Sequence, residues 1–507
     1  MNLHDFGGFS ARNLIVDVRF RSQAQFKHFW GAWTTSGPPS VPAQDPNERF
    51  LLIGSGTTLE HEFRHYHDFL LSYSSLQTYW FRLQIFMSGL PLVLQVLEDP
   101  DVDVVPFPVV AWAELSPKER QAYLEDALGK AHSSRPWSPP YIRGSGPSSK
   151  GTFVTGREPG YEQQVLHLLS KQVFIRDNTR RGTVSAGAFA LTPRFLFELS
   201  ALLAQAFAVN QTYGLAEFVE FLAYLSRDKS MYAAFFTRML VLFQERSATP
   251  PEHYPLAINW TKVDWRALSV MATWCMLGCH QDGEIAYPER RWARVYRAAI
   301  QDFEAVFPRY LNEPDLLRHL DSLFKVTPFD EALRATSDHL GVFLAEGTRA
   351  IRDNPNTAEP HEAALAVFEG LLKDRRILVE RFIAEPAAFC ELPRHMQSQQ
   401  DWPLCPVHLK LWESGAYALK EDLNRLHADA RFNLERNARD EACAGDVLYP
   451  QLFSGGTAVP LDQLLLLNRL VHGFEIFLDP HQLNPSQEMD AREVFMTRYG
   501  KSLLRVH

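Results

Sequence analysis

The spacing of apolar residues predicts a mainly α-helical protein with a small β element near its N-terminus. Apolar and β-branched residues dominate 13–20 (NLIVDVRF) and 49–56 (RFLLIGSG), and glycines close the second segment, so both are predicted as short strands. From Leu191 onward, apolar residues recur at helical spacing almost throughout. The pattern therefore predicts an α+β arrangement, in which the β element lies beside one helix and a large helical body follows.

Residues 57–72, TTLEHEFRHYHDFLLS, are predicted to form the helix that follows the second strand. Thr57 and Thr58 are suitable N-cap residues, Glu60 lies in the first turn, and no Gly or Pro interrupts the segment. A second apolar helix is predicted directly after it, around LQTYWFRLQIFMSGLPLVLQVLE. This order places the first turn of the 57–72 helix beside a sheet edge.

The 57–72 helix contains a His-Glu-x-x-His run that is typical of a metal site. His61 and His65 are one turn apart and share a face, so both imidazoles can bind one ion. Glu62 lies about 100° further round the axis, where it suits proton transfer from a metal-bound water rather than coordination. Asp68 returns to the histidine face, where its carboxylate can hold a ligating imidazole by a hydrogen bond.

A simpler interpretation is a charged helix that is rich in histidine. The chain has 18 histidines, so a five-residue pattern of this kind can arise by chance. Glu60, Arg64 and Asp68 also follow one another at intervals of four, which predicts a ladder of ion pairs along a solvent-exposed face. His67 points away from His65 and is expected to be a surface or packing residue.

A metal site of this kind needs a third ligand, and Glu198 is the strongest candidate. It lies in the apolar segment 192–209, TPRFLFELSALLAQAFAV, which begins with Thr-Pro and is predicted to be a helix. A carboxylate among so many apolar residues must be paired or bound to a metal. Ala201 and Gln205 share its face, so a second helix can approach closely at Ala201, and Gln205 is expected to support the site.

Two alternatives to this third ligand remain open. Glu198 could instead form a buried ion pair or hydrogen bond with a core Arg or Tyr. The ligand could also be an acid nearer to the histidines, such as Glu98 or Asp99.

The His61-Glu62-x-x-His65 run, with Glu198 on a later helix, resembles the zincin-type metallopeptidases and, among them, the gluzincins. The resemblance implies that His61, His65 and Glu198 hold zinc, and that Glu62 is the general base that activates water for peptide hydrolysis. The interval between His65 and Glu198 is longer than is usual in that group, and no third histidine of the metzincin kind follows His65.

Composition limits the size, partners and compartment of the protein. The chain has 507 residues, and a Pro-rich break near 245–260 divides it into predicted domains 1–245, which contains the motif, and 246–507, which is helical. A net charge of −9 with scattered basic residues argues against nucleic acid or an anionic membrane as the main partner. No apolar run reaches about 18 residues, and five cysteines without a secretory signal indicate a reducing cytoplasm.

Two further segments are of interest. A loop-rich stretch, 389–409, contains a possible Cys₂His₂ structural zinc set, although its spacing matches no common zinc-finger pattern: Cys390, His395, Cys405 and His408. Residues 133–160 are dense in Ser, Pro and Gly and are predicted to be a long loop, either a lid or a surface insertion. Cys275 and Cys279 lie in an apolar helical stretch and are expected to pack in the core.

Three function classes follow from the sequence. The first is a cytoplasmic zinc metallopeptidase that acts on a peptide or protein. The second is a peptide-modifying oxygenase that depends on 2-oxoglutarate and holds iron(II) with the same two histidines and one carboxylate. The third is a helical interaction protein in which the motif is incidental. The oligomeric state and the oxyanion-stabilising group do not follow from the sequence.

Overall fold

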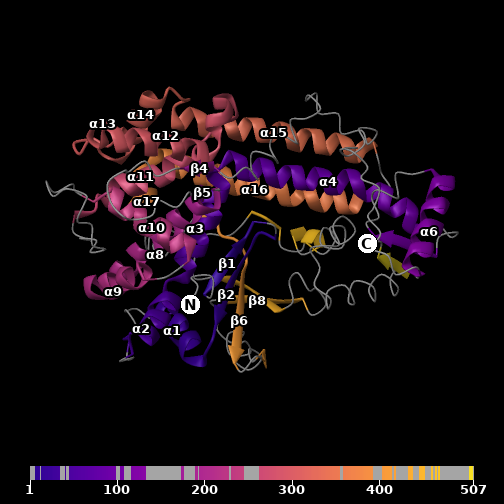
Figure 1. The fold of residues 1–507 in the computed structure, drawn as a ribbon, viewed down its shortest axis with the longest axis horizontal. Helices are drawn as coiled ribbons and strands as arrows, with labels where there is room; N and C mark the ends of the chain where they lie inside the picture. The colour runs from indigo at the N-terminus through magenta and orange to yellow at the C-terminus, as the bar shows by residue number, and fades with distance from the viewer. Residues whose placement is uncertain are drawn as a thin grey trace.

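The computed structural model describes residues 6–11, 13–34, 40–41, 45–98, 103–107, 116–132, 173–175, 189–191, 193–227, 230–244, 262–353, 358–391, 402–413, 416–417, 432–437, 445–450, 458–460, 463–464, 466–468 and 502–505. These residues form a mainly helical protein with a mixed β-sheet, as the apolar pattern predicts (Figure 1). The 133–160 loop lies outside them.

The first part of the chain alternates strands and helices. Its elements are β1 (Gly7–Ser10), β2 (Ile15–Phe20), α1 (Gln23–Thr34), α2 (Pro46–Gly56), α3 (Thr58–Leu71), α4 (Tyr73–Glu98), β3 (Val104–Phe107) and α6 (Pro117–His132). The predictions of a strand over 13–20, a helix over 57–72 and an apolar helix after it are confirmed by β2, α3 and α4.

The described residues in the middle of the chain are mostly helical, with one short antiparallel pair of strands. Its elements are β4 (Val173–Ile175), β5 (Phe189–Leu191), α8 (Pro193–Tyr213), α9 (Leu215–Leu225), α10 (Met231–Leu242), α11 (Trp265–Met276), η4 (His280–Ala286), α12 (Pro288–Gln301), α13 (Phe303–Val306), α14 (Glu313–Phe324), α15 (Phe329–Asp353), α16 (Ala358–Ala384) and α17 (Pro386–Glu391). The helix predicted over 192–209 is therefore α8. Helices α4, α15 and α16 pack side by side (Figure 1).

The C-terminal part returns to β structure, with β6 (Val407–Glu413), β7 (Ala416–Tyr417), β8 (Phe432–Asn437), β9 (Gly445–Pro450) and β10 (Ser502–Arg505). The main sheet has the order β1-β2-β6-β9-β8, with β7 paired to β6. Strand β2 is antiparallel to β1 and parallel to β6. The expectation of helix almost throughout after Leu191 is thus wrong beyond α17. The alternation of apolar residues in VHLKLWE is the local signal for β6.

The segment 49–56 is helical, so its prediction as a strand is wrong. Asp45 caps α2 by accepting a hydrogen bond from the backbone N–H of Glu48, and Pro46 occupies the first turn. Phe50 and Ile53 then lie one turn apart, and both are buried. The order before α3 is therefore helix, turn, helix.

Both predicted domains contribute to one apolar core. Buried side chains from α3, α4 and α8 belong to the same hydrophobic cluster as those from α11, α15 and α16. The sheet also spans the predicted division, because β2 pairs with β6. The predicted boundary at 245 falls outside the described residues. No described helix is both long enough and apolar enough to cross a membrane.

Candidate metal centre

Helix α3, which carries the His-Glu-x-x-His run, is buried on nearly every side. It packs most extensively on α8 and also contacts α16, α4 and β1. Glu60, Arg64 and Asp68 are 3%, 3% and 0% exposed. The prediction of a solvent-exposed ion-pair ladder is therefore wrong, because neighbouring elements cover the face that helical spacing assigns to these three residues.

His61, His65 and Glu198 converge at one point between α3 and α8. The Nε2 atoms of the two histidines lie 3.1 Å apart. Glu198 Oε2 lies 3.6 Å from His61 Nε2 and 3.7 Å from His65 Nε2. Among the described residues, these three form the one group of His, Cys, Asp or Glu side chains that can share a metal ion. The structure thus brings together the three residues that the sequence predicts.

The spacing of these three candidate ligand atoms suits one shared metal ion. Zinc bonds of about 2.0–2.2 Å at tetrahedral angles place ligand atoms about 3.3–3.5 Å apart. Bonds of similar length at right angles, as in a facial iron triad, place them about 3 Å apart. The observed separations of 3.1, 3.6 and 3.7 Å span both values, as expected for side chains that can share one ion. Nδ1 of His61 is buried and has no hydrogen-bond partner among the described residues.

Glu198 is nearly buried, and its surroundings favour its charged form. Burial alone would raise the pKa of its carboxyl, but the adjacent imidazoles of His61 and His65 outweigh burial and hold that pKa well below its usual range. Arg194, one turn earlier on α8, places Nε 3.7 Å from Glu198 Oε1. An ionised carboxylate is the form that binds a metal.

Glu62 lies beside the three ligand residues and is 3% exposed. Burial raises the pKa of its carboxyl to about 7, and the charge of Glu198 adds to this increase. Three neighbours lower the pKa of Glu62: His61, the backbone N–H of Phe9, which donates a hydrogen bond, and the charge of Arg19. Glu62 Oε2 accepts no hydrogen bond from the described residues. A carboxyl that titrates near neutral pH is suited to general acid–base chemistry.

Strand β1 holds the carboxylate of Glu62 through Gly7 and Phe9. A Cβ atom at Gly7 would lie 2.9 Å from Glu62 Oε1 and 2.6 Å from the carbonyl oxygen of Asp17. Gly7 therefore provides the space that Glu62 occupies against the strand. Gly7 has no local signal in the sequence, because its role depends on the contact with α3, a helix that follows much later in the chain.

The two residues predicted to support the ligands contact other groups. Asp68 Oδ1 accepts a hydrogen bond of 3.0 Å from Arg64 Nε. The amide nitrogen of Gln205 lies 3.3 Å from the carbonyl oxygen of Gly54 and 3.4 Å from Thr57 Oγ1. Gln205 therefore links α8 to the start of α3 rather than to the histidines.

His67 is a packing residue, which is one of the two roles predicted for it, packing or surface. It is fully buried, and its Nε2 lies 2.9 Å from the carbonyl oxygen of Pro403. Burial lowers the pKa of its imidazole to about 4. His67 thus connects α3 to the chain that enters β6.

Several of the other predicted ligands fall outside the described residues. Glu98 is the last residue of α4, but its side chain and Asp99 are not described; among the described residues, Glu198 is the acid beside the histidines. In the predicted Cys₂His₂ set, Cys390 and Cys405 are buried, whereas His395 and the side chain of His408 are outside the description. That second zinc site stays a prediction. Cys275 and Cys279 are fully buried, as expected for core residues.

Arg194 and Tyr232 are further polar residues next to the centre. The Arg194 guanidinium lies 5.2 Å from the ring centroid of Tyr232, and its side chain is 62% exposed. Burial raises the pKa of Tyr232, while Arg194 lowers it and Glu198 raises it. Because Tyr232 is on α10, its proximity to Glu198 depends on tertiary packing and had no local sequence signal.

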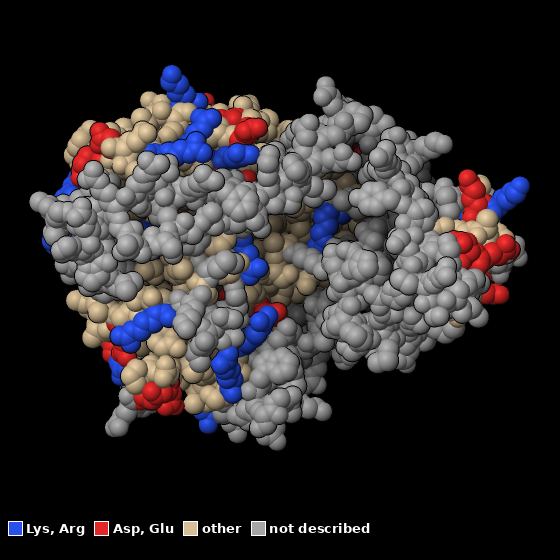
Figure 2. Space-filling model, viewed as in Figure 1, with Lys and Arg blue, Asp and Glu red and all other residues tan. Residues whose placement is uncertain are grey.

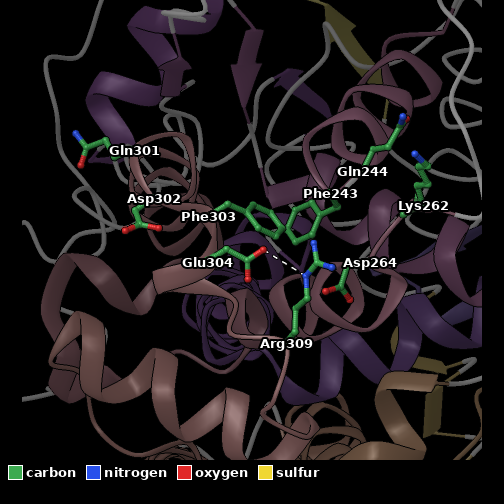
Figure 3. A pocket seen from close by; sticks show the side chains of 10 residues that line it. Phe243, Gln244, Lys262, Asp264, Gln301, Asp302, Phe303, Glu304 and Arg309 are labelled. Carbon is green, nitrogen blue, oxygen red and sulfur yellow. Dashed lines mark ion pairs between the residues drawn. The ribbon is translucent and has the colours of Figure 1, made fainter. Parts of the chain in front are cut away.

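A separate cavity of about 470 Å³ lies between the end of α10 and the α12–α13 turn. Figure 3 shows Phe243 and Phe303 facing one another in it, with Arg309 and Glu304 joined by an ion pair of 3.3 Å. None of its lining residues belongs to the candidate metal centre. The cavity is therefore distinct from the His61–His65–Glu198 cluster.

Comparison with known proteins gives no relatives for this chain. No protein-family model matches it, and no curated protein or solved structure is detectably similar to it.

Proposed function

We propose that the protein is a zinc metallopeptidase. The observation that carries the proposal is the convergence of His61, His65 and Glu198, with Glu62 directly beside them. Two imidazoles and one carboxylate are a common ligand set for catalytic zinc, which leaves a fourth position for water. The peptide substrate follows from the resemblance of this residue set to the gluzincins.

The division of roles follows from the position and charge of each side chain. His61, His65 and Glu198 would hold zinc, which when bound supplies Lewis-acid polarisation of a carbonyl and an acidified water. Glu62 accepts a proton from water and later returns it to the leaving amine, a role that fits its buried carboxylate beside His61 and Glu198. Gly7 and Phe9 fix its carboxylate during these transfers.

Arg194 and Tyr232 are the best placed residues to stabilise negative charge on a reacting oxygen. Both lie next to Glu198, and Arg194 is largely exposed, so it can reach a bound substrate. A guanidinium and a phenolic O–H both donate hydrogen bonds to an oxyanion. We assign them this role in the same reaction.

The proposal places the enzyme in the cytoplasm, without nucleic acid or membrane as partner. Among the described residues, Cys275, Cys279, Cys390 and Cys405 form no disulfide, which supports a reducing compartment. On the face drawn in Figure 2, basic and acidic side chains are interspersed over the described surface. The described residues of that face form no extended basic stripe for a polyanion.

Peptide digestion tests this function. The purified protein is incubated with a mixture of unstructured peptides, and new termini are identified by mass spectrometry. Chelation should abolish cleavage and zinc should restore it. Cleavage that survives complete metal removal would contradict the proposal. Iron as the bound metal, with peptide oxidation that requires 2-oxoglutarate, would instead assign the same residues to an oxygenase.

A further inference from the structure

Arg64 lies inside the His-Glu-x-x-His run and contacts four helices. Its side chain is buried, and its Nε lies 3.0 Å from Asp68 Oδ1 on α3 and 2.7 Å from Ser200 Oγ on α8. Nη1 donates to the carbonyl oxygen of Phe389 on α17 at 2.8 Å. Nη2 donates to Thr273 Oγ1 on α11 at 3.0 Å. The guanidinium also lies 3.9 Å from the centre of the Phe389 ring.

The contact with Ser200 is the one that concerns the metal centre. Ser200 is two residues after Glu198 on α8, and Arg64 is one residue before His65 on α3. The same Arg64 Nε also bonds Asp68 on α3, so one polar cluster of Arg64, Asp68 and Ser200 joins the two helices that carry the candidate ligands. The adjacent Ala201 is fully buried and has a small side chain, which lets the helices approach closely.

We propose that Arg64 is a positioning residue that sets the register between α3 and α8, and with it the distance from His61 and His65 to Glu198. This inference rests on the proposed metal centre. A metal requires its ligand atoms within a few tenths of an ångström of their ideal places, so a small slide of α8 along α3 would separate Glu198 from both imidazoles.

Only an arginine fits this position. The planar guanidinium directs its N–H groups to several acceptors at fixed angles, and here they lie on different helices. A lysine would keep the positive charge opposite Asp68 but could not reach Ser200, Thr273 and Phe389 together. The buried charge itself is balanced by Asp68, which is fully buried.

A matched pair of single substitutions tests the inference. Ser200→Ala removes the bond between Arg64 and α8, whereas Thr273→Val removes a bond of the same arginine to α11 and leaves the α3–α8 link intact. Both remove one hydroxyl from a buried site, so both should lower the melting temperature by similar amounts. Zinc affinity is measured for each by competition with a chromophoric chelator.

We expect Ser200→Ala to weaken zinc binding about 10-fold or more, as is usual when a group that orients a metal ligand is removed. Thr273→Val should retain the wild-type zinc affinity, and Arg64→Lys should bind zinc at least as weakly as Ser200→Ala. Equal zinc affinities for folded Ser200→Ala and Thr273→Val would overturn the inference while leaving the metal centre itself intact. A wild-type protein without zinc affinity would overturn both.

Discussion

Glu198 Oε2 on α8 lies 3.6 Å from His61 Nε2 on α3, and both side chains are almost completely buried. A carboxylate in this position, with a second imidazole at 3.7 Å, is either the partner of a protonated histidine or the third ligand of a metal. An ion-pair partner and a metal ligand differ in whether the loss of Glu198 lowers stability or zinc affinity, so this residue is the first to test.

Glu198→Ala should weaken zinc binding sharply, because a His₂ pair alone forms an incomplete site. If Glu198 were only an ion-pair partner, the variant would lose stability while its zinc affinity stayed normal. Zinc titration together with thermal unfolding separates the two results. Gln205→Ala is the comparison on the same helix, because its contacts are with Gly54 and Thr57 and not with the histidines; it should weaken zinc binding far less than Glu198→Ala does.

Glu62→Gln should leave the fold and bound zinc unchanged while peptide cleavage falls by at least about 100-fold. The amide has nearly the shape of the carboxylate but accepts no proton at neutral pH. Turnover, zinc content and melting temperature are measured on the same preparation. Undiminished cleavage would refute the assignment of Glu62 as the base, and loss of zinc would show that it is a ligand.

Gly7→Ala should displace the Glu62 carboxylate, because the added methyl would lie 2.6 Å from Asp17 O and 2.9 Å from Glu62 Oε1. We expect a loss of about 1–3 kcal/mol of stability and a fall in the rate of cleavage, with zinc retained. Gly8→Ala on the same strand is the control, since its methyl would meet no atom within 4 Å. Equal effects of the two substitutions would contradict the proposed contact.

Glu289 at the start of α12 should make stability depend on pH. It is 1% exposed, neither carboxylate oxygen accepts a hydrogen bond from the described residues, and burial raises its pKa from 4.5 to about 7. Below pH 4.5 the carboxyl is protonated in both the folded and the unfolded chain. As pH rises toward 7 and above, the unfolded chain loses its proton more readily, so the folded state loses up to about 3 kcal/mol.

Glu289→Gln removes this titration. Its melting temperature should therefore rise relative to wild type between pH 5 and pH 8, where the buried charge penalises only the wild-type protein. If the melting temperatures of the two proteins differ by the same amount at pH 5 and at pH 8, Glu289 does not titrate in this range.

Local sequence spacing was sufficient to predict the three residues that converge between α3 and α8. His61 and His65 share a face wherever a helix forms, and the uninterrupted sequence of 57–72 predicted that helix correctly, although the Thr57 hydroxyl donates to Ile53 O and does not cap it. Glu198 was identified because an acid in an apolar helix requires a partner. That His61 and His65 are its partners follows only from the packing of α3 on α8, which no local sequence pattern shows.

The errors have physical causes that particular residues illustrate. The apolar run in 49–56 fits a buried strand or a buried helix equally well, and the Asp45 cap decides for the helix. Spacing placed Glu60, Arg64 and Asp68 on one face but could not show that other helices cover it. The hydrogen bonds of Arg64 to several helices and the close approach of Glu62 to Gly7 depend on contacts between distant segments. Only the fold reveals them.

The central claim is that His61, His65 and Glu198 hold zinc, and the metal content of the purified protein tests it most directly. Wild type and His61→Ala are prepared in parallel without chelators, and their metals are determined by mass spectrometry while circular dichroism verifies folding. We predict about one zinc per chain in the wild type and almost none in His61→Ala. A folded wild-type protein without a stoichiometric transition metal would contradict the account.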